Sequence, residues 1–427
     1  MGLTSAMYSG VSGLMTYGDA MNVTGDNIAN VNTIGFKGNS TIFADVLANS
    51  VSNGATTMQF GRGALIQGVK ASFAQGSFST TGNATDMGIQ GAGFFVVKDT
   101  ANNGTYYTRA GQFIINNDGK LANPNDYLVQ GYKLTTNASG VVTRANGGGD
   151  IDISGVQSTP KTTTMYRMGL NLSTVASAGT TFSTSLNVYN SLGEEATITY
   201  TFTKTSTALE WQYNTSGPSG TSLSGTGSSG TLTFNSAGVL STRGAYNGTG
   251  QAAITADLPL VISGFPSGAA ALTISWDLYN TASSAQRNEI TGYASNSVTN
   301  SMWQDGYSTG VLRGLSVDQE GIISGLFSNG QTQKMYQVQM ADFISPWGLS
   351  RQGNTLFAET TESGQPILGF AKSGGFGTIY GSSLELSSVD LSREFVDMIQ
   401  NQRAYQANSR IITTVDQMLQ DVIALKR

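Results

Sequence analysis

The sequence lacks histidine and cysteine and is poor in proline and charge. Among its 427 residues there is no His and no Cys, 7 are Pro and 11% are charged, whereas soluble proteins usually carry about 25% charged residues. Without His or Cys, the chain cannot build a Ser-His-Asp or Cys-His nucleophile, or a zinc site on those ligands. Disulfides are excluded for the same reason.

Charge and hydropathy exclude further classes of partner. The net charge is −5, and phosphate binding needs a clustered basic face, so we expect no nucleic-acid partner. No apolar run approaches the roughly 20 residues of a membrane span, so we expect no membrane insertion. The N-terminus lacks the basic, apolar and small-residue regions of a secretory signal peptide, so no cleaved signal is expected.

The chain is instead rich in glycine, with 54 residues, and in serine and threonine. Its length predicts two to four domains. Residues 1–34 and 388–427 contain no proline and carry apolar residues at helical spacing, which predicts a helix at each end. The middle of the chain is typical of strands and turns.

Both terminal segments carry a seven-residue apolar repeat. Four-and-three alternation is typical of a coiled-coil seam, although two ordinary amphipathic helices on a globular core produce a similar pattern. Because the repeats occupy the two chain ends with β-structure between them, we favour a helical hairpin with an insertion. The predicted subunit-assembly seam consists of Leu3, Met7, Leu14, Tyr17, Met21, Ile28, Val31, Leu391, Phe395, Met398, Tyr405, Ile412, Leu419 and Val422.

The middle shows strand and hairpin patterns. Residues 197–203 alternate strictly, which predicts an antiparallel strand that buries Ile198, Tyr200 and Phe202 on one face. Asn or Asp followed three residues later by Gly recurs within 115–121, 136–142, 234–240 and 317–323. This spacing predicts an Asx turn closed by a glycine at positive φ. A calcium loop is disfavoured, because its third and fifth ligand positions are missing.

No segment offers a catalytic constellation. Residues 91–96 begin like a dinucleotide loop, but the third Gly is missing and a strand-like run follows. Glu194 and Glu195 are adjacent, so in a strand they point to opposite faces. We therefore predict a protein that is not an enzyme, with no catalytic residue, no cofactor and no metal.

The segment Asn27–Lys37 closely resembles the signature of bacterial flagellar rod and hook axial proteins. Residues 91–95 and 107–113 resemble the first β-domain of that family, and 389–394, 398–409 and 416–419 resemble its C-terminal helix. The chain is thereby identified as a member over roughly 1–135 and 310–427, and 165–300 matches loosely. The family-motif residues are Asn27, Ile28, Ala29, Asn30, Gly35, Phe36, Lys37, Gln402, Arg403 and Tyr405.

The resemblance implies an α+β fold in which the terminal helices form a coiled-coil tube domain and nested antiparallel β-domains are inserted between them. The implied domains are an inner helical tube domain at 1–75 and 372–427, a first β-domain at 76–165 and 300–371, and an outer β-domain at 166–299. Glycine-rich connections are expected to act as hinges. They lie at Ala74–Gly82, Gly369–Gly377, Thr159–Gly169 and Gly292–Thr299.

The implied function is a structural subunit of the flagellar hook, a curved polymeric tube that transmits torque from rod to filament as a universal joint. The alternative is a distal rod subunit, which the long stretch 47–74 favours; the chain length and the β-rich 165–300 insert favour the hook. A third hypothesis is an extracellular adhesin or carbohydrate-binding β-protein with exposed Trp211, Trp276, Trp303 and Trp347. It requires several of these rings on one exposed face, and burial of each Trp in a strand core is the commoner alternative.

The implied partners are further copies of the chain, the distal rod protein, the hook cap protein, the hook–filament junction protein, the hook-length ruler and the flagellar type III export apparatus. The implied location is the extracellular hook and basal body of the bacterial flagellum. Export would proceed without cleavage of a signal peptide.

Overall fold

The computed structural model describes residues 2–47, 49–53, 56–136, 141–244, 250, 252–280, 285–286 and 289–424, without the side chains of 2–3, 49–53, 56–60, 279–280 and 285–286. The chain forms two compact units. Unit 1 comprises 1–155, 314–326 and 332–427, and unit 2 comprises 156–313 and 327–331. The finer division of unit 1 into a tube domain and a first β-domain stays a prediction.

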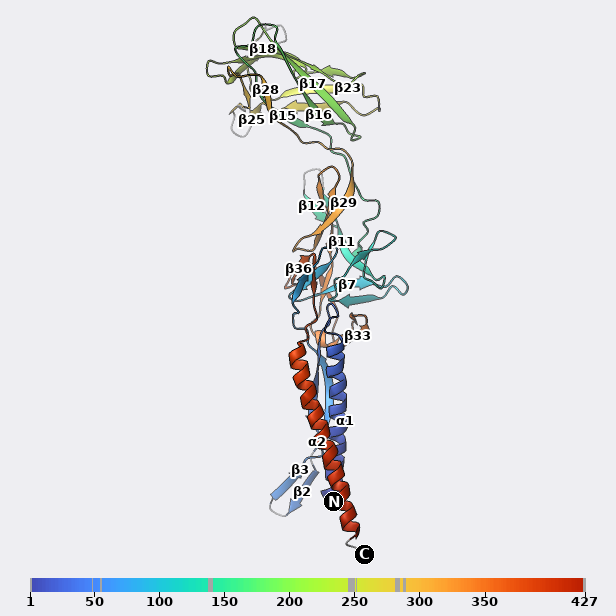
Figure 1. The fold of residues 1–427 in the computed structure, drawn as a ribbon. Coiled ribbons are helices and arrows are strands. Elements are labelled where there is room, and N and C mark those ends of the chain that lie inside the picture. The colour runs from blue at the N-terminus through green and yellow to red at the C-terminus, as the bar shows by residue number, and fades with distance from the viewer. Residues whose placement is uncertain are drawn as a thin grey trace. The chain divides into compact units, whose positions relative to one another are not determined.

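Unit 1 contains both terminal helices, α1 (Gly2–Ala29) and α2 (Leu391–Ala424), which lie side by side (Figure 1). The hairpin of β1 (Asn39–Asp45) and β4 (Ala64–Ala71) packs along α1, and β2 (Asn49–Asn53) pairs with β3 (Thr56–Phe60) within the same stretch. The stretch after α1 is therefore an extended pair of hairpins.

The remaining strands of unit 1 form mostly antiparallel pairs around an aromatic core. The central order is β30-β31-β11-β7-β8-β34-β33. Phe94, Tyr107, Phe343 and Phe357 pack together in the core of this sheet. The strands are β5 (Phe78–Thr80), β6 (Met87–Gln90), β7 (Phe94–Lys98), β8 (Thr105–Thr108), β9 (Ile114–Ile115), β10 (Leu121–Ala122), β11 (Leu128–Thr136), β12 (Val142–Arg144), β13 (Gly149–Asp150), β30 (Ile322–Phe327), β31 (Thr332–Val338), β32 (Met340–Asp342), β33 (Ser350–Gly353), β34 (Leu356–Ala358), β35 (Ile367–Gly369), β36 (Thr378–Gly381) and β37 (Ser383–Glu385), with the short helix η1 (Pro346–Gly348).

Unit 2 packs two six-stranded sheets around one core, with orders β19-β23-β24-β15-β27, to which β28 adds beside β15, and β16-β17-β18-β20-β21-β22. The strands are β14 (Gln157–Ser158), β15 (Met165–Asn171), β16 (Thr181–Tyr189), β17 (Glu195–Lys204), β18 (Glu210–Ser216), β19 (Ser222–Ser224), β20 (Ser229–Phe234), β21 (Leu240–Gly244), β22 (Ala252–Ala253), β23 (Leu258–Ser263), β24 (Leu272–Trp276), β25 (Tyr279–Asn280), β26 (Ala285–Gln286), β27 (Ile290–Thr291) and β28 (Val298–Gln304); β29 (Gly310–Val317) runs on into unit 1.

The predicted strand within 197–203 is confirmed. It lies in β17, and Ile198, Tyr200 and Phe202 are fully buried on one face. The expectation of purely antiparallel sheets needs one correction, because β15 pairs in parallel with both β24 and β27. Strands far apart in the chain meet at β15, and hairpin signals do not report such pairs.

The four tryptophans do not form one exposed face. Trp211 and Trp276 are fully buried in the core of unit 2, whereas Trp303 and Trp347 are exposed. The adhesin hypothesis requires exposed rings, so it fails for Trp211 and Trp276, for which the strand-core alternative is confirmed. Trp211 and Tyr213 are two residues apart in β18, so both rings lie on the same face of the strand and point into the core.

Three of the predicted Asx–Gly hairpins are confirmed. The side-chain oxygens of Asn116, Asn235 and Asp318 each accept hydrogen bonds from backbone N–H groups two and four residues later. The glycines at 119, 238 and 321 all take positive φ. Residues 137–140 of the fourth candidate lie outside the described residues.

Candidate functional site: the joint between the terminal helices and the β-structure

The terminal helices pack antiparallel. Near one end of the pair, the Asn27 side chain donates to Glu394 Oε1 at 3.1 Å. Near the other end, a Cβ at Gly10 would lie 3.1 Å from Ile412 Cγ1. Small residues on α1 thus let α2 approach closely.

The structure places the predicted seam residues in two groups. Those that are partly buried are Met7, Leu14, Tyr17, Met21, Ile28, Val31, Met398, Ile412 and Leu419. Those that are exposed are Leu391, Phe395, Tyr405 and Val422. Leu3 lies in α1, and its side chain is outside the described set. The β1–β4 hairpin accounts for part of this burial, since the Tyr17 ring lies 5.6 Å from the Phe43 ring of β1, so the role of these residues as an assembly seam stays a prediction.

The motif that follows α1 holds three chain segments together. Asn27 is almost fully buried, and its side chain donates to Asn39 O at 2.7 Å while its Oδ1 accepts from Asn39 N at 2.8 Å. The Ser388 N–H donates to Phe36 O. The end of α1, the start of β1 and the segment before α2 are thereby fixed to one another.

Gly35 has the conformation and the space that only glycine tolerates. Its φ is +68°, and an added Cβ would lie 2.5 Å from Ala110 N. Its N–H donates to the backbone oxygen of Glu385 at 2.8 Å. The motif requires glycine here because α1 turns directly against the segment after β8.

The carboxylate of Glu385 is the centre of the joint. Its Oε1 accepts hydrogen bonds from Lys37 Nζ at 2.6 Å, from Gln75 Nε2 at 2.6 Å and from Gly76 N at 2.9 Å. Arg109 Nη1 lies 3.5 Å from Oε2. The side chains of Lys37 and Glu385 are fully buried, and that of Arg109 is 5% exposed. Four segments that are distant in sequence therefore meet on one buried carboxylate.

The cluster has two cations and one anion in a dry environment. Burial lowers the pKa of Lys37, and the nearby Glu385 carboxylate opposes this shift. Burial also lowers the pKa of Arg109. Lys37 additionally donates to Ala74 O, and Arg109 donates to the backbone oxygens of Ile89 and Gly91. Buried charges need such partners, and removal of one partner is costly.

The same contacts bear on the first expected hinge, Ala74–Gly82. Gln75 and Gly76 both bond to Glu385, and a Cβ at Gly76 would lie 2.1 Å from Leu386 O. Glycine serves close approach of two backbones here. The expectation of a hinge at this segment does not fit the structure.

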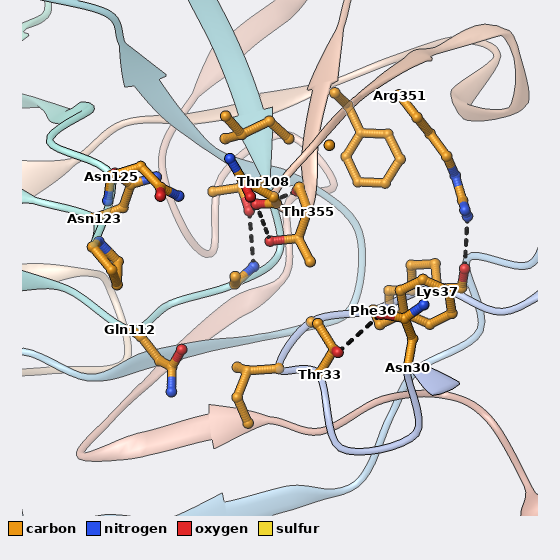
Figure 2. Close-up of a pocket in the computed structure, with 18 of the residues that line it drawn as sticks. Asn30, Thr33, Phe36, Lys37, Thr108, Gln112, Asn123, Asn125, Arg351 and Thr355 are labelled. Carbon is orange, nitrogen blue, oxygen red and sulfur yellow. Dashed lines mark hydrogen bonds between the residues drawn. The ribbon is translucent and has the colours of Figure 1, made fainter. Parts of the chain in front are cut away.

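A cavity of about 540 Å³ opens beside the joint. Figure 2 shows Arg351 reaching the backbone of Lys37, where its Nη2 donates to Lys37 O at 2.7 Å. The same guanidinium lies 5.5 Å from the centroid of the Phe36 ring, and burial lowers its pKa. Amide and hydroxyl side chains such as Asn30 and Thr355 line much of the rest.

The remaining family-motif residues lie on or next to the two helices. Ile28 and Ala29 end α1, and Asn30 follows it and lines the cavity. Gln402, Arg403 and Tyr405 are exposed on α2. Sequence reasoning missed Glu385 as the centre of the joint. Its signal was a lone acidic residue between two apolar ones, Leu384 and Leu386, which indicates a buried charge in need of a partner.

Among the described residues, no group of three or more Asp or Glu is placed to hold a metal ion. No helix in the described part of the chain is long and apolar enough to span a membrane. The buried charges of the joint are paired with one another and with backbone oxygens.

Four protein-family models match the chain. They are the flagella basal body rod protein model at 7–37, the flagellar hook protein FlgE/F/G D1 domain at 88–164, the flagellar basal body protein FlaE D2 domain at 171–307, and the flagellar basal body rod FlgEFG protein C-terminal model at 381–425. With paired terminal helices and inserted β-structure, these matches define a structural protein of the flagellar rod and hook class.

Relatives that match over nearly the full length of the chain identify the family within this class. The flagellar hook protein FlgE of Borreliella burgdorferi is 32% identical over 99% of this chain and 99% of the relative. That of Salmonella typhimurium is 34% identical over 97% of this chain and 98% of the relative. The chain belongs to the flagellar hook protein family, whose members are structural proteins and not enzymes.

A more distant likeness exists to the crystal structure of Helicobacter pylori flagellar hook protein FlgE2. It has a TM-score of 0.43 and 14% identity, and it covers 72% of this chain and 100% of that chain. The family assignment rests on the sequence relatives alone.

Proposed function

We propose that this chain polymerises into the curved tube of the flagellar hook, which transmits torque from the rod to the filament as a universal joint. The observation that carries the proposal is the full-length match to hook proteins. It includes residues 171–307, which match the FlaE D2 model. A distal rod subunit is the disfavoured alternative.

In the polymer, α1 and α2 form the coiled-coil inner tube domain. Their antiparallel packing within one chain and the exposed apolar residues of the predicted seam support this arrangement. The inner domain comprises 1–75 and 372–427, the first β-domain 76–165 and 300–371, and the outer β-domain 166–299. The joint at Glu385 fixes the inner domain to the first β-domain.

The partners in this proposal are other copies of the chain, the distal rod protein, the hook cap protein, the hook–filament junction protein, the hook-length ruler and the type III export apparatus. The chain is exported without signal cleavage. Its lack of cysteine supports passage as an unfolded, uncrosslinked chain. Mass spectrometry of extracellular polymer then finds the N-terminus at Met1 or Gly2, and a start about twenty residues later contradicts this route.

The test of the main proposal is to grow polymer from the purified chain and to image it by electron microscopy. Curved tubes are the expected result. Straight rods favour the distal rod alternative, and the absence of any polymer across a wide range of salt and protein concentrations contradicts the proposal.

A further inference from the structure

The joint brings an amine and a carboxamide to one buried carboxylate oxygen. Lys37 Nζ and Gln75 Nε2 each lie 2.6 Å from Glu385 Oε1, so the two nitrogens are neighbours that share one acceptor. Lys37 Nζ also donates to the backbone oxygen of Ala74, the residue directly before Gln75. A nucleophile, an acyl group and a group that can carry protons therefore meet at one point.

The Gln75 carboxamide is held in one orientation, and its carbonyl group is polarised. Its Nε2 donates to Ile89 O at 3.1 Å, and its Oε1 accepts from the Gly91 N–H at 2.9 Å. A backbone N–H in this position stabilises the negative charge that develops on a carbonyl oxygen during nucleophilic attack. Because both reacting groups are already fixed, the entropic part of the barrier is also lowered.

The nucleophile is shielded from water. The side chains of Lys37 and Glu385 are fully buried. Burial lowers the pKa of Lys37, the Glu385 carboxylate opposes this shift, and the positive charge of Arg109 adds to it. Attack on a carbonyl requires the neutral amine, so burial favours the reactive form of lysine. Gln75 itself reaches the surface, which gives a released ammonium ion a path into solvent.

The chain contains a second set of the same groups in a different environment. Lys120 Nζ donates to Asp150 Oδ2 at 2.9 Å, and Gln130 Nε2 donates to Asp150 Oδ1 at 2.9 Å. The side chains of Lys120 and Asp150 are 32% and 30% exposed, and the hydrogen bond with Asp150 raises the pKa of Lys120. This site has the three groups without the burial or the shared oxygen, so it serves as an internal control.

We propose that Lys37 Nζ attacks Gln75 Cδ and forms an amide bond within the chain, with release of ammonium. Glu385 first takes one proton from the Lys37 ammonium group, and the neutral amine then adds to Cδ. As the bond between Cδ and Nε2 breaks, the leaving nitrogen takes the proton held by Glu385 and a second proton from Nζ. Glu385 ends as a carboxylate, and the reaction consumes no oxidant or other reactant.

The amide closes the segment 38–74 into a loop that contains β1, β2, β3 and β4. A covalent bond that closes a loop stabilises the folded state mainly by restricting the unfolded chain. The ion pair between Lys37 and Glu385 is the state of the joint before this reaction. The bond forms within one chain, so the proposal stands or falls independently of the proposed assembly into a hook.

The test is a peptide map of the purified native chain after incubation at physiological temperature. The chain is then denatured, digested with trypsin and sequenced by mass spectrometry. An amide at Lys37 blocks cleavage there, so the expected product is a branched peptide that joins residues 1–62 to residues 71–98 with the loss of one ammonia. This product is expected to accumulate with time, and incubation in urea is expected to prevent it. Cleavage after Lys120 is expected to remain complete.

Lys37→Arg and Gln75→Leu are each expected to abolish the branched peptide, and the matched control Gln130→Leu is expected to leave its yield unchanged. Four outcomes overturn the proposal: no branched peptide in the native chain, the same peptide in either joint variant, loss of water through a bond between Lys37 and Glu385, or an equal yield of a bond between Lys120 and Gln130. The native chain alone decides three of these, so a variant that fails to fold does not prevent the test.

Discussion

Replacement of Glu385 by Gln is expected to destabilise unit 1 more than replacement of Lys37 by Met. The Glu385 carboxylate is the one acidic group in contact with the buried Lys37 and Arg109 side chains among the described residues. Glu385→Gln leaves two buried cations without their anion. Lys37→Met leaves the carboxylate with Arg109 and two neutral donors, Gln75 and Gly76.

The size of the effect follows from the general cost of breaking a buried ion pair, about 3–5 kcal/mol. We expect Lys37→Met to lie near the lower end of this range and Glu385→Gln near the upper end. The double variant removes both partners together, so its cost is expected to be smaller than the sum by about 1–3 kcal/mol.

Amide hydrogen exchange measures the stability of the joint itself. A global unfolding curve would instead combine the unfolding of the two units. The Gly35 N–H donates to Glu385 O, so its exchange reports on opening of the joint. A loss of about 3 kcal/mol corresponds to roughly 100-fold faster exchange. Lys120→Met, which breaks the partly exposed pair with Asp150, is the matched control and should change exchange little. Equal costs for the two single variants, or strict additivity, would refute the reasoning.

Three further predictions concern the joint and the seam. Gly35→Ala forces a side chain into a left-handed, occupied position, and amide hydrogen exchange in the β5–β37 strands should show a loss of about 1–3 kcal/mol in the free energy of opening. Burial raises the pKa of Glu394 above its ordinary value of 4.5, so between the unfolded and folded pKa values the folded state holds a proton that the unfolded state has released. Protection of the amides at the start of α2 should therefore fall as the pH rises from 4.5 through the folded pKa, and Glu394→Gln should remove this pH dependence of amide exchange. Leu419→Asp should abolish polymerisation in sedimentation assays while unit 2 keeps its native circular dichroism, whereas Gln417→Asp, at an exposed position, should polymerise normally.

The sequence predicted those features that depend on local periodicity. The helices at both ends follow from apolar spacing, and the strand that buries Tyr200 follows from strict alternation. The Asx–Gly hairpins follow from side-chain chemistry within a few residues. Each of these signals is complete within one segment.

The joint could not be predicted in the same way. Glu385 meets Lys37 across 348 residues and Gln75 across 310 residues. Resemblance singled out Lys37, but its partner and its full burial depend on how distant segments fold together. The hinge predicted at Ala74–Gly82 rested on glycine content. Sequence alone does not distinguish a glycine that allows two backbones to approach, as Gly76 does, from one that provides flexibility.

The same dependence on tertiary structure applies to the parallel pairs of β15 and to the buried Trp276. Each depends on which strands become neighbours, and single-strand patterns do not contain that information.

A cryo-electron microscopy reconstruction of the bent polymer, resolved subunit by subunit, tests the central claim most directly. We predict a curved tube whose inner wall is formed by α1 and α2, with the Lys37–Glu385 contact intact in every subunit and unit 1 superposing as one rigid body. A straight polymer, an inner wall without these helices, or subunits in which unit 1 bends at Ala74–Gly82 and the Lys37–Glu385 contact opens would contradict the account.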